Sequence, residues 1–114
     1  AQNRGKNRFE SIGCGGCHLS AFEGVEGAYT DLLVHRMGPQ LDNGLPEHRA
    51  EGDAWRTAPL WGLRHRPRYL HDDSAKTIEA AIVKHGGEAE HSRKAYQKLT
   101  REQRAEVLRF LGGI

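Results

Sequence analysis

The sequence predicts a single all-α domain, residues 1–114, in which about four short helices are joined by long loops. A chain of 114 residues has room for one hydrophobic core only. Several segments carry apolar residues at helical spacing, and few alternate as strands do. With 14 glycines and 37% hydrophobic residues, the core is lean, and a bound apolar cofactor would supply the missing buried surface.

Charge and hydropathy exclude two classes of partner. The 17 basic and 15 acidic residues are interspersed, without the basic stripe that nucleic-acid binding requires. Mean hydropathy is −0.73, and no apolar run approaches the ~20 residues of a membrane span. The chain opens at Ala1 without a leader, which is compatible with a removed signal peptide or with a piece of a longer protein.

The first expected helix covers residues 5–12. Gly5, Phe9 and Ile12 recur at helical spacing, so one face is apolar. A glycine-rich stretch, residues 13–16, then ends the helix and begins the most informative motif of the chain.

That motif is Cys14-Gly15-Gly16-Cys17-His18, the C-x-x-C-H signature of covalent haem attachment. The two thiols would form thioethers to the two vinyl groups of one haem c, and His18 would be the proximal iron ligand. A redox disulfide would usually follow a strand, a zinc site would need further ligands, and a buried thiol pair would not need the histidine. Covalent haem is therefore favoured, and its attachment indicates an oxidising, extracytoplasmic compartment such as the periplasm.

Residues 19–61 are expected to be mostly loop, because glycines and prolines interrupt every pattern. A short helix at residues 29–37 is possible. A loop of this length is unusual in a compact domain unless it packs on a ligand, and the haem would be that ligand.

The clearest helix begins after Thr77, an expected N-cap, and is stopped by Gly86-Gly87. Its apolar face has residues at i, i+3, i+4 and i+7, namely Ile78, Ala81, Ile82 and His85. His85 is therefore expected to face inward.

Two more helices complete the chain. A short one is expected at residues 92–99. The last starts at Thr100, with Gln103 three residues on as in a capping box. Its apolar residues Val107, Leu108 and Leu111 are suited to packing against the first helix.

Several motifs, in order, resemble the di-haem oxidoreductase family, relatives of bacterial di-haem cytochrome c peroxidases. They are the run from Tyr29 to Gly38, the run from Trp55 to Leu63, Tyr69-Leu70-His71-Asp72, Ala75-Lys76-Thr77-Ile78-Glu79, and His85-Gly86-Gly87-Glu88-Ala89. The resemblance covers nearly the whole chain and implies a small c-type cytochrome fold, equivalent to the C-terminal, electron-transferring haem domain. Asp73 departs from it, because relatives commonly have glycine there.

The resemblance also bears on the sixth iron ligand. In relatives the distal ligand lies near the end of the helix that begins here at Ile78, a position occupied by His85. One rival is Met37, the single methionine, in a loop that could cover the distal face, and the other is a different histidine. Of the other histidines, His71 belongs to the family's turn motif, His35 is expected beside the haem, and His48, His65 and His91 are expected to face solvent.

Supporting roles are considered for an arginine, two tryptophans and a group of four basic residues. Arg56 could neutralise a haem propionate through its forked donors, or be a surface arginine. Trp61 and Trp55 could wall the porphyrin. Four basic residues, Arg64, His65, Arg66 and Arg68, could dock an acidic partner or be solvated loop.

The sequence thus predicts electron transfer by one six-coordinate haem, with a redox partner protein or a second haem domain as partner. The alternative is a relay domain or subunit of a di-haem peroxidase whose catalytic haem lies outside this chain, since only one haem motif is present. A haem-based gas sensor is a more distant alternative.

Overall fold

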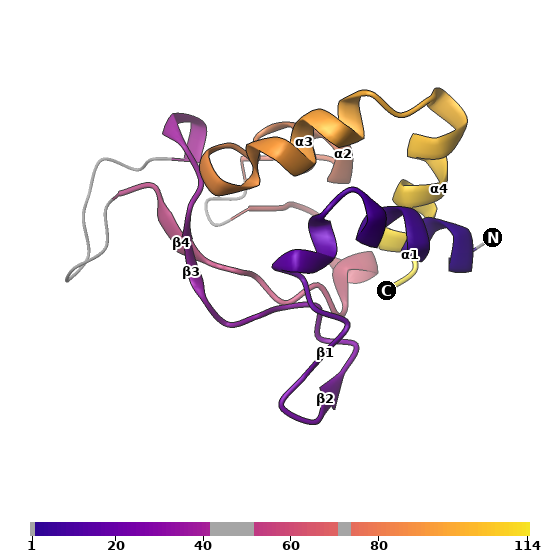
Figure 1. Ribbon diagram of the computed structural model, residues 1–114, viewed down its shortest axis with the longest axis horizontal. Helices are drawn as coiled ribbons and strands as arrows, with labels where there is room; N and C mark the ends of the chain where they lie inside the picture. Colours follow the sequence, from indigo (N-terminus) through magenta and orange to yellow (C-terminus); the bar gives the residue numbers. More distant parts are fainter. Residues whose placement is uncertain (1, 42–51, 71–73) are drawn as a thin grey trace.

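The computed structural model describes residues 2–41, 52–70 and 74–114 (Figure 1). Predictions were made above for His48, His71 and Asp73, and these three residues lie outside the described ranges. His65 and His91 are exposed, as expected.

The expected all-α class is wrong, because the described residues form a mixed fold of helices and two small antiparallel sheets. The four α-helices are α1 (Gln2–Ser11), α2 (Ile78–Val83), α3 (Glu90–Gln97) and α4 (Arg101–Leu111). One sheet pairs β1 (Ala21–Phe22) with β2 (Val25–Glu26), and the other pairs β3 (Val34–Arg36) with β4 (Ala54–Arg56). Four 3₁₀ turns join them: η1 (Cys14–Gly16), η2 (Pro39–Leu41), η3 (Leu63–His65) and η4 (Gly87–Ala89).

The possible helix at residues 29–37 is replaced by strand β3. Positive φ angles at Tyr29 (56°) and Leu32 (58°) cannot continue a right-handed helix. The backbone pairs instead with β4, and His35 lies opposite Trp55. Further bonds extend this pairing, because the Thr57 N–H donates to the Leu33 carbonyl at 2.9 Å.

The β1–β2 hairpin is the second element that the sequence did not predict. Glu23 (φ 52°) and Gly24 (φ 79°) occupy the two turn positions, and positive φ at both is the conformation that suits a two-residue hairpin. The glycine taken as a sign of irregular loop thus forms a turn. The hairpin extends away from the helices (Figure 1).

Helices α1 and α4 pack closely, as expected, and form one side of the core. Phe9 and Phe110 have ring centroids 5.5 Å apart, and Val107 and Leu111 are buried beside them. The helices approach so closely at Gly5 that a Cβ there would collide with the backbone carbonyl of Glu106. The core cluster also includes Tyr29, Leu63 and Tyr96.

The helix starts follow the capping signals. The Thr77 hydroxyl accepts from the Ala80 N–H at 3.0 Å. Thr100 and Gln103 form both bonds of a capping box, at 3.1 and 2.9 Å. Two other helix boundaries differ from the prediction. Helix α2 stops at Val83, before His85, and α3 begins two residues earlier than expected. No helix in the described part of the chain is long and apolar enough to span a membrane.

Candidate functional site

A mostly apolar cavity of about 330 Å³ lies in the middle of the fold. Its walls come from the end of α1, the β3–β4 sheet, α2, α3 and α4. Cys14, Cys17, His18 and His85 all line it, so residues 67 positions apart in the sequence share one space. A volume of this size lies within the range of ~300–1,000 Å³ typical of small-molecule and cofactor sites.

The two cysteines are presented by a tight turn directly after α1. Gly13 has φ 97°, a conformation that favours glycine, and the His18 N–H donates to the Cys14 carbonyl at 2.9 Å. Both thiols are free. Burial raises the pKa of Cys14 to about 11 and also raises the pKa of Cys17. Neutral thiols do not suit a redox dithiol, which needs a lowered pKa.

His18 has one ring nitrogen fixed by the backbone. Its Nδ1–H donates to the Tyr29 carbonyl at 2.8 Å, which leaves Nε2 as the nitrogen able to act as a ligand. Its pKa is lowered to about 4, mainly because the ring is buried, with a smaller contribution from His85 and against the opposing effect of the Tyr29 carbonyl. The ring is therefore neutral, as metal ligation requires.

His85 repeats this arrangement from another wall of the cavity. Its Nδ1–H donates to the Ala81 carbonyl at 2.8 Å, and burial lowers the pKa of the ring. Ile78, Ala81 and Ile82 line the same cavity, so the inward face predicted from their spacing is confirmed. Although α2 ends at Val83, His85 keeps its inward position because its own N–H donates to the Ile82 carbonyl at 3.0 Å.

Met37 lines the cavity too and is half-buried. Its backbone carbonyl accepts from the Gly86 N–H at 3.1 Å, which places it beside His85. Both candidates for the sixth ligand therefore border the same space, and His85 is distinguished by its hydrogen-bonded, neutral ring.

Some of the expected supporting residues line the cavity and others do not. Arg56 lines the cavity from β4 and donates to the Leu32 carbonyl. Trp55 also lines it, with its Nε1–H donated to the Leu41 carbonyl at 2.7 Å. Trp61 is 57% exposed and is not among the lining residues. Of the four basic residues at 64–68, only Arg66 reaches the cavity.

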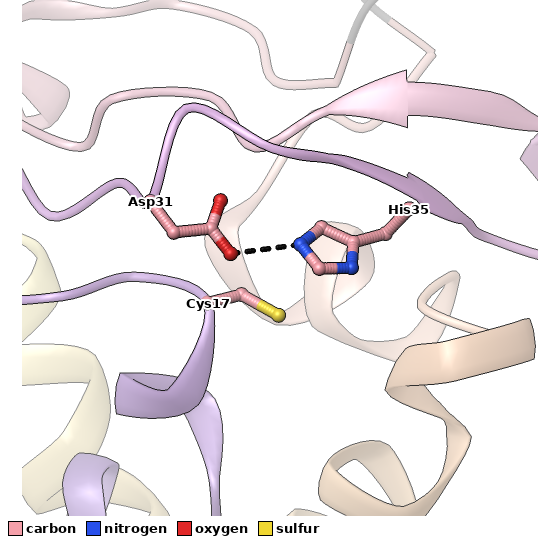
Figure 2. A group of neighbouring side chains, drawn as sticks. All are labelled: Cys17, Asp31 and His35. Atoms are coloured by element: carbon pink, nitrogen blue, oxygen red, sulfur yellow. Dashed lines mark hydrogen bonds and ion pairs between the residues drawn. The ribbon is translucent and has the colours of Figure 1, made fainter.

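A carboxylate–imidazole–carboxylate group occupies the cavity wall near Cys17. His35 Nε2 lies 2.8 Å from Asp31 Oδ2, and His35 Nδ1 lies 3.0 Å from Glu88 Oε1. Figure 2 shows the Cys17 sulfur beside the Asp31–His35 pair, and the three ligand-type atoms lie within 4.8 Å of one another. The place of His35 was expected, whereas neither carboxylate was singled out from the sequence. The i, i+4 spacing of Asp31 and His35 was the one signal available.

The two carboxylates favour the protonated form of His35. The carboxylates of Glu88 and then Asp31 raise the pKa of His35 against its burial. Burial would raise the pKa of Asp31, but bonds from the Leu33 N–H, Thr57 and His35 outweigh it and lower that pKa. The Arg36 N–H and then His35 lower the pKa of Glu88. His35 therefore lies between two carboxylates that favour its imidazolium form, whereas burial favours the neutral form of His18 and His85.

The family model described as Di-haem oxidoreductase, putative peroxidase, matches residues 2–114. The chain belongs to this family. No match was found among curated proteins or among solved structures. For a di-haem oxidoreductase the expected cofactor is haem, and the cavity has the donor set for it: two thiols on one turn and two neutral imidazoles. This di-haem oxidoreductase chain carries a single C-x-x-C-H motif.

Proposed function

We propose that this domain transfers electrons through one haem c, bound covalently by Cys14 and Cys17 and ligated by His18 and His85. The observation that carries the proposal is that both imidazoles line one cavity with both thiols, each with its Nδ1–H given to a backbone carbonyl. When bound, the haem supplies an iron that accepts and releases one electron.

The protein residues would fix and desolvate that group. The Tyr29 and Ala81 carbonyls hold the tautomer and the orientation of the two imidazoles. Apolar side chains such as Ile78, Ile82 and Leu63 exclude water from the cavity. Arg56 and Arg66, exposed at its rim, are suited to neutralise propionate carboxylates.

A second candidate function is favoured by the single haem motif in a family described as di-haem. In this proposal the domain is the electron-relay part of a peroxidase or related oxidoreductase, and the catalytic haem belongs to another domain or subunit. The partner is then that haem domain instead of a separate redox protein. Covalent haem attachment also leads us to propose an extracytoplasmic, periplasmic location.

The proposal is tested by exchanging the two candidate distal ligands in the haem-loaded protein. His85→Ala should give a high-spin or water-ligated ferric spectrum that binds carbon monoxide readily once reduced, because one axial donor is lost. Met37→Leu should leave the low-spin spectrum unchanged, since it conserves apolar volume. Optical spectra of both oxidation states make the measurement.

Three results would contradict the proposal. Haem that separates from the denatured polypeptide would exclude covalent attachment. Conversion to high spin by Met37→Leu, with no change in His85→Ala, would assign the distal ligand to Met37. Rapid carbon monoxide binding or peroxide turnover by the unaltered protein would favour the sensor or the enzyme.

A further inference from the structure

His85 lies in a segment that has little stiffness of its own. Helix α2 ends at Val83, and two glycines, Gly86 and Gly87, follow His85 directly. Glycines restrict the backbone least, so the helix orients His85 from its N-terminal side only. Something else must fix the chain on its C-terminal side.

Strand β3 and the residues after it supply part of that support. The Gly86 N–H donates to the Met37 carbonyl at 3.1 Å. The backbones run so close that a Cβ on Gly38 would come within 2.9 Å of the Gly87 nitrogen, and a Cβ on Gly87 would collide with the Arg36 carbonyl. The segment after His85 therefore packs directly on the β3 backbone.

Glu88 closes this contact with both of its carboxylate oxygens. Oε1 accepts from His35 Nδ1 at 3.0 Å, and Oε2 accepts from the Arg36 N–H at 2.5 Å. Both partners belong to β3, whereas Glu88 belongs to η4, three residues after His85. One side chain thus joins the ligand segment to the strand by two bonds.

The far end of this connection is buried. His35 Nε2 bonds Asp31 at 2.8 Å, and Asp31, which is 5% exposed, accepts from the Leu33 N–H at 2.8 Å. Strand β3 is itself fixed to β4, and Arg36 Nε pairs with Asp53 at 2.7 Å. Glu88 therefore binds to an anchored strand.

We propose that Glu88 is the positioning residue for the sixth iron ligand, holding His85 in place by binding His35 and the Arg36 N–H of β3. This inference rests on the proposed function. An exposed carboxylate ordinarily contributes little to stability, so its value here lies in restricting a glycine-rich segment. Groups that orient a metal ligand from outside its coordination sphere have this effect in other metal sites.

The test uses haem-loaded Glu88→Ala and Glu88→Gln. We expect Glu88→Ala to bind carbon monoxide in the ferrous form about tenfold more tightly, because loss of a charge-assisted bond shifts the ligand equilibrium by that order. Glu88→Gln keeps an acceptor oxygen for the Arg36 N–H and should lie between Glu88→Ala and the unaltered protein. Ferric spectra should show a matching rise in the high-spin fraction.

The matched control is Glu90→Ala. Glu90 has a side chain 52% exposed against 50% for Glu88, but its ion pairs within the described residues are with Arg93 and Lys94 of its own helix. It should bind carbon monoxide as the unaltered protein does. Equal opening in Glu90→Ala and Glu88→Ala would overturn the inference, because the effect would then be general destabilisation.

The remaining outcomes separate the inference from the function on which it rests. If His85→Ala opens the iron and Glu88→Ala does not, the function stands and the role of Glu88 is wrong. If the unaltered protein already binds carbon monoxide as tightly as His85→Ala, the proposed ligation fails and the inference fails with it. If Glu88→Ala folds poorly, a carbon monoxide affinity of Glu88→Gln that lies between those of the unaltered protein and His85→Ala still supports the inference.

Discussion

Among the residues that the structure describes, three histidines line the cavity, and their hydrogen bonds divide them into two kinds. His18 and His85 each donate Nδ1–H to a neutral backbone carbonyl, and burial lowers the pKa of both rings. His35 bonds a carboxylate with each nitrogen, and its pKa is raised. The rings of His18 and His85 thus each keep Nε2 available as a ligand, whereas both nitrogens of His35 are bonded to carboxylates.

The charge on His35 predicts a pH-dependent stability. Because the pKa of His35 is raised in the folded state, its interactions stabilise the fold fully below pH 6.5, the ordinary pKa of histidine. This stabilisation is lost as the pH rises through the pKa of His35 in the folded protein. The lowered pKa values of Asp31 and Glu88 give the opposite dependence, with stabilisation present above 4.5 and lost at lower pH. His35→Gln should therefore reduce the free energy of unfolding most near pH 6, by about 1–2 kcal/mol, and less at pH 9.

Guanidinium unfolding of the haem-loaded protein at both pH values makes this measurement. His65→Gln is the control, because His65 is exposed and its side-chain bond in the described part of the chain is to the neighbouring Arg64. A His35→Gln effect that does not shrink between pH 6 and pH 9 would mean that packing, not charge, holds His35 in place.

At the residue scale, sites formed by residues close in sequence were predictable, whereas contacts between residues distant in sequence were not. The Cys14–His18 motif is complete within five residues, and the spacing from Ile78 placed His85 inward. Glu88 lies 53 residues from His35. Nothing local to either residue indicates that contact, because it depends on how β3 and η4 meet.

The same distinction holds for whole elements. Helices α2 and α4 begin where Thr77 and Thr100 cap them, and both caps involve residues at most three positions away. Strand β3 depends on a partner about twenty residues ahead, so a stretch with some helical spacing became a strand. The β3–β4 sheet was missed because strand formation is decided by pairing, which the local pattern at residues 29–37 does not contain.

The contact between α1 and α4 leads to a prediction in which helix propensity and packing have opposite effects on stability. Alanine is favoured over glycine inside a helix by about 0.5–1 kcal/mol. At Gly5, however, the added Cβ would collide with the Glu106 carbonyl and approach the Phe110 Cβ at 2.7 Å. Gly5→Ala should therefore lower the free energy of unfolding by roughly 1–3 kcal/mol, as overpacking does.

Thermal or guanidinium unfolding would measure the effect of Gly5→Ala. Asn3→Ala is the matched control, because Asn3 is exposed on the same helix and alanine should leave stability unchanged or slightly raised. A stabilised Gly5→Ala variant would show that α1 and α4 lie farther apart than described here.

On the scale of the whole molecule, the hydrophobic core borders the cavity. Phe9, Tyr29, Val107 and Phe110 pack together between α1 and α4, while much of the apolar surface of α2 and α3 faces the cavity. Ile78 and Ile82, which line the cavity, are only partly buried. The side containing α2 and β3–β4 is therefore expected to depend on bound haem for its packing.

Removing the attachment points tests this dependence. An empty cavity costs about 24 cal/mol per Å³. For about 330 Å³ this gives an upper value of ~8 kcal/mol, comparable with the whole stability of a small domain, ~5–15 kcal/mol. The Cys14→Ser/Cys17→Ser variant, freed of haem, should therefore lose its cooperative thermal transition by circular dichroism and bind a hydrophobic dye. His85→Ala is the control, since it keeps the haem attached and should still unfold cooperatively. A haem-free double variant that melts like the loaded protein would show that the α1–α4 core is sufficient for folding. The stability of the domain would then not depend on a cofactor.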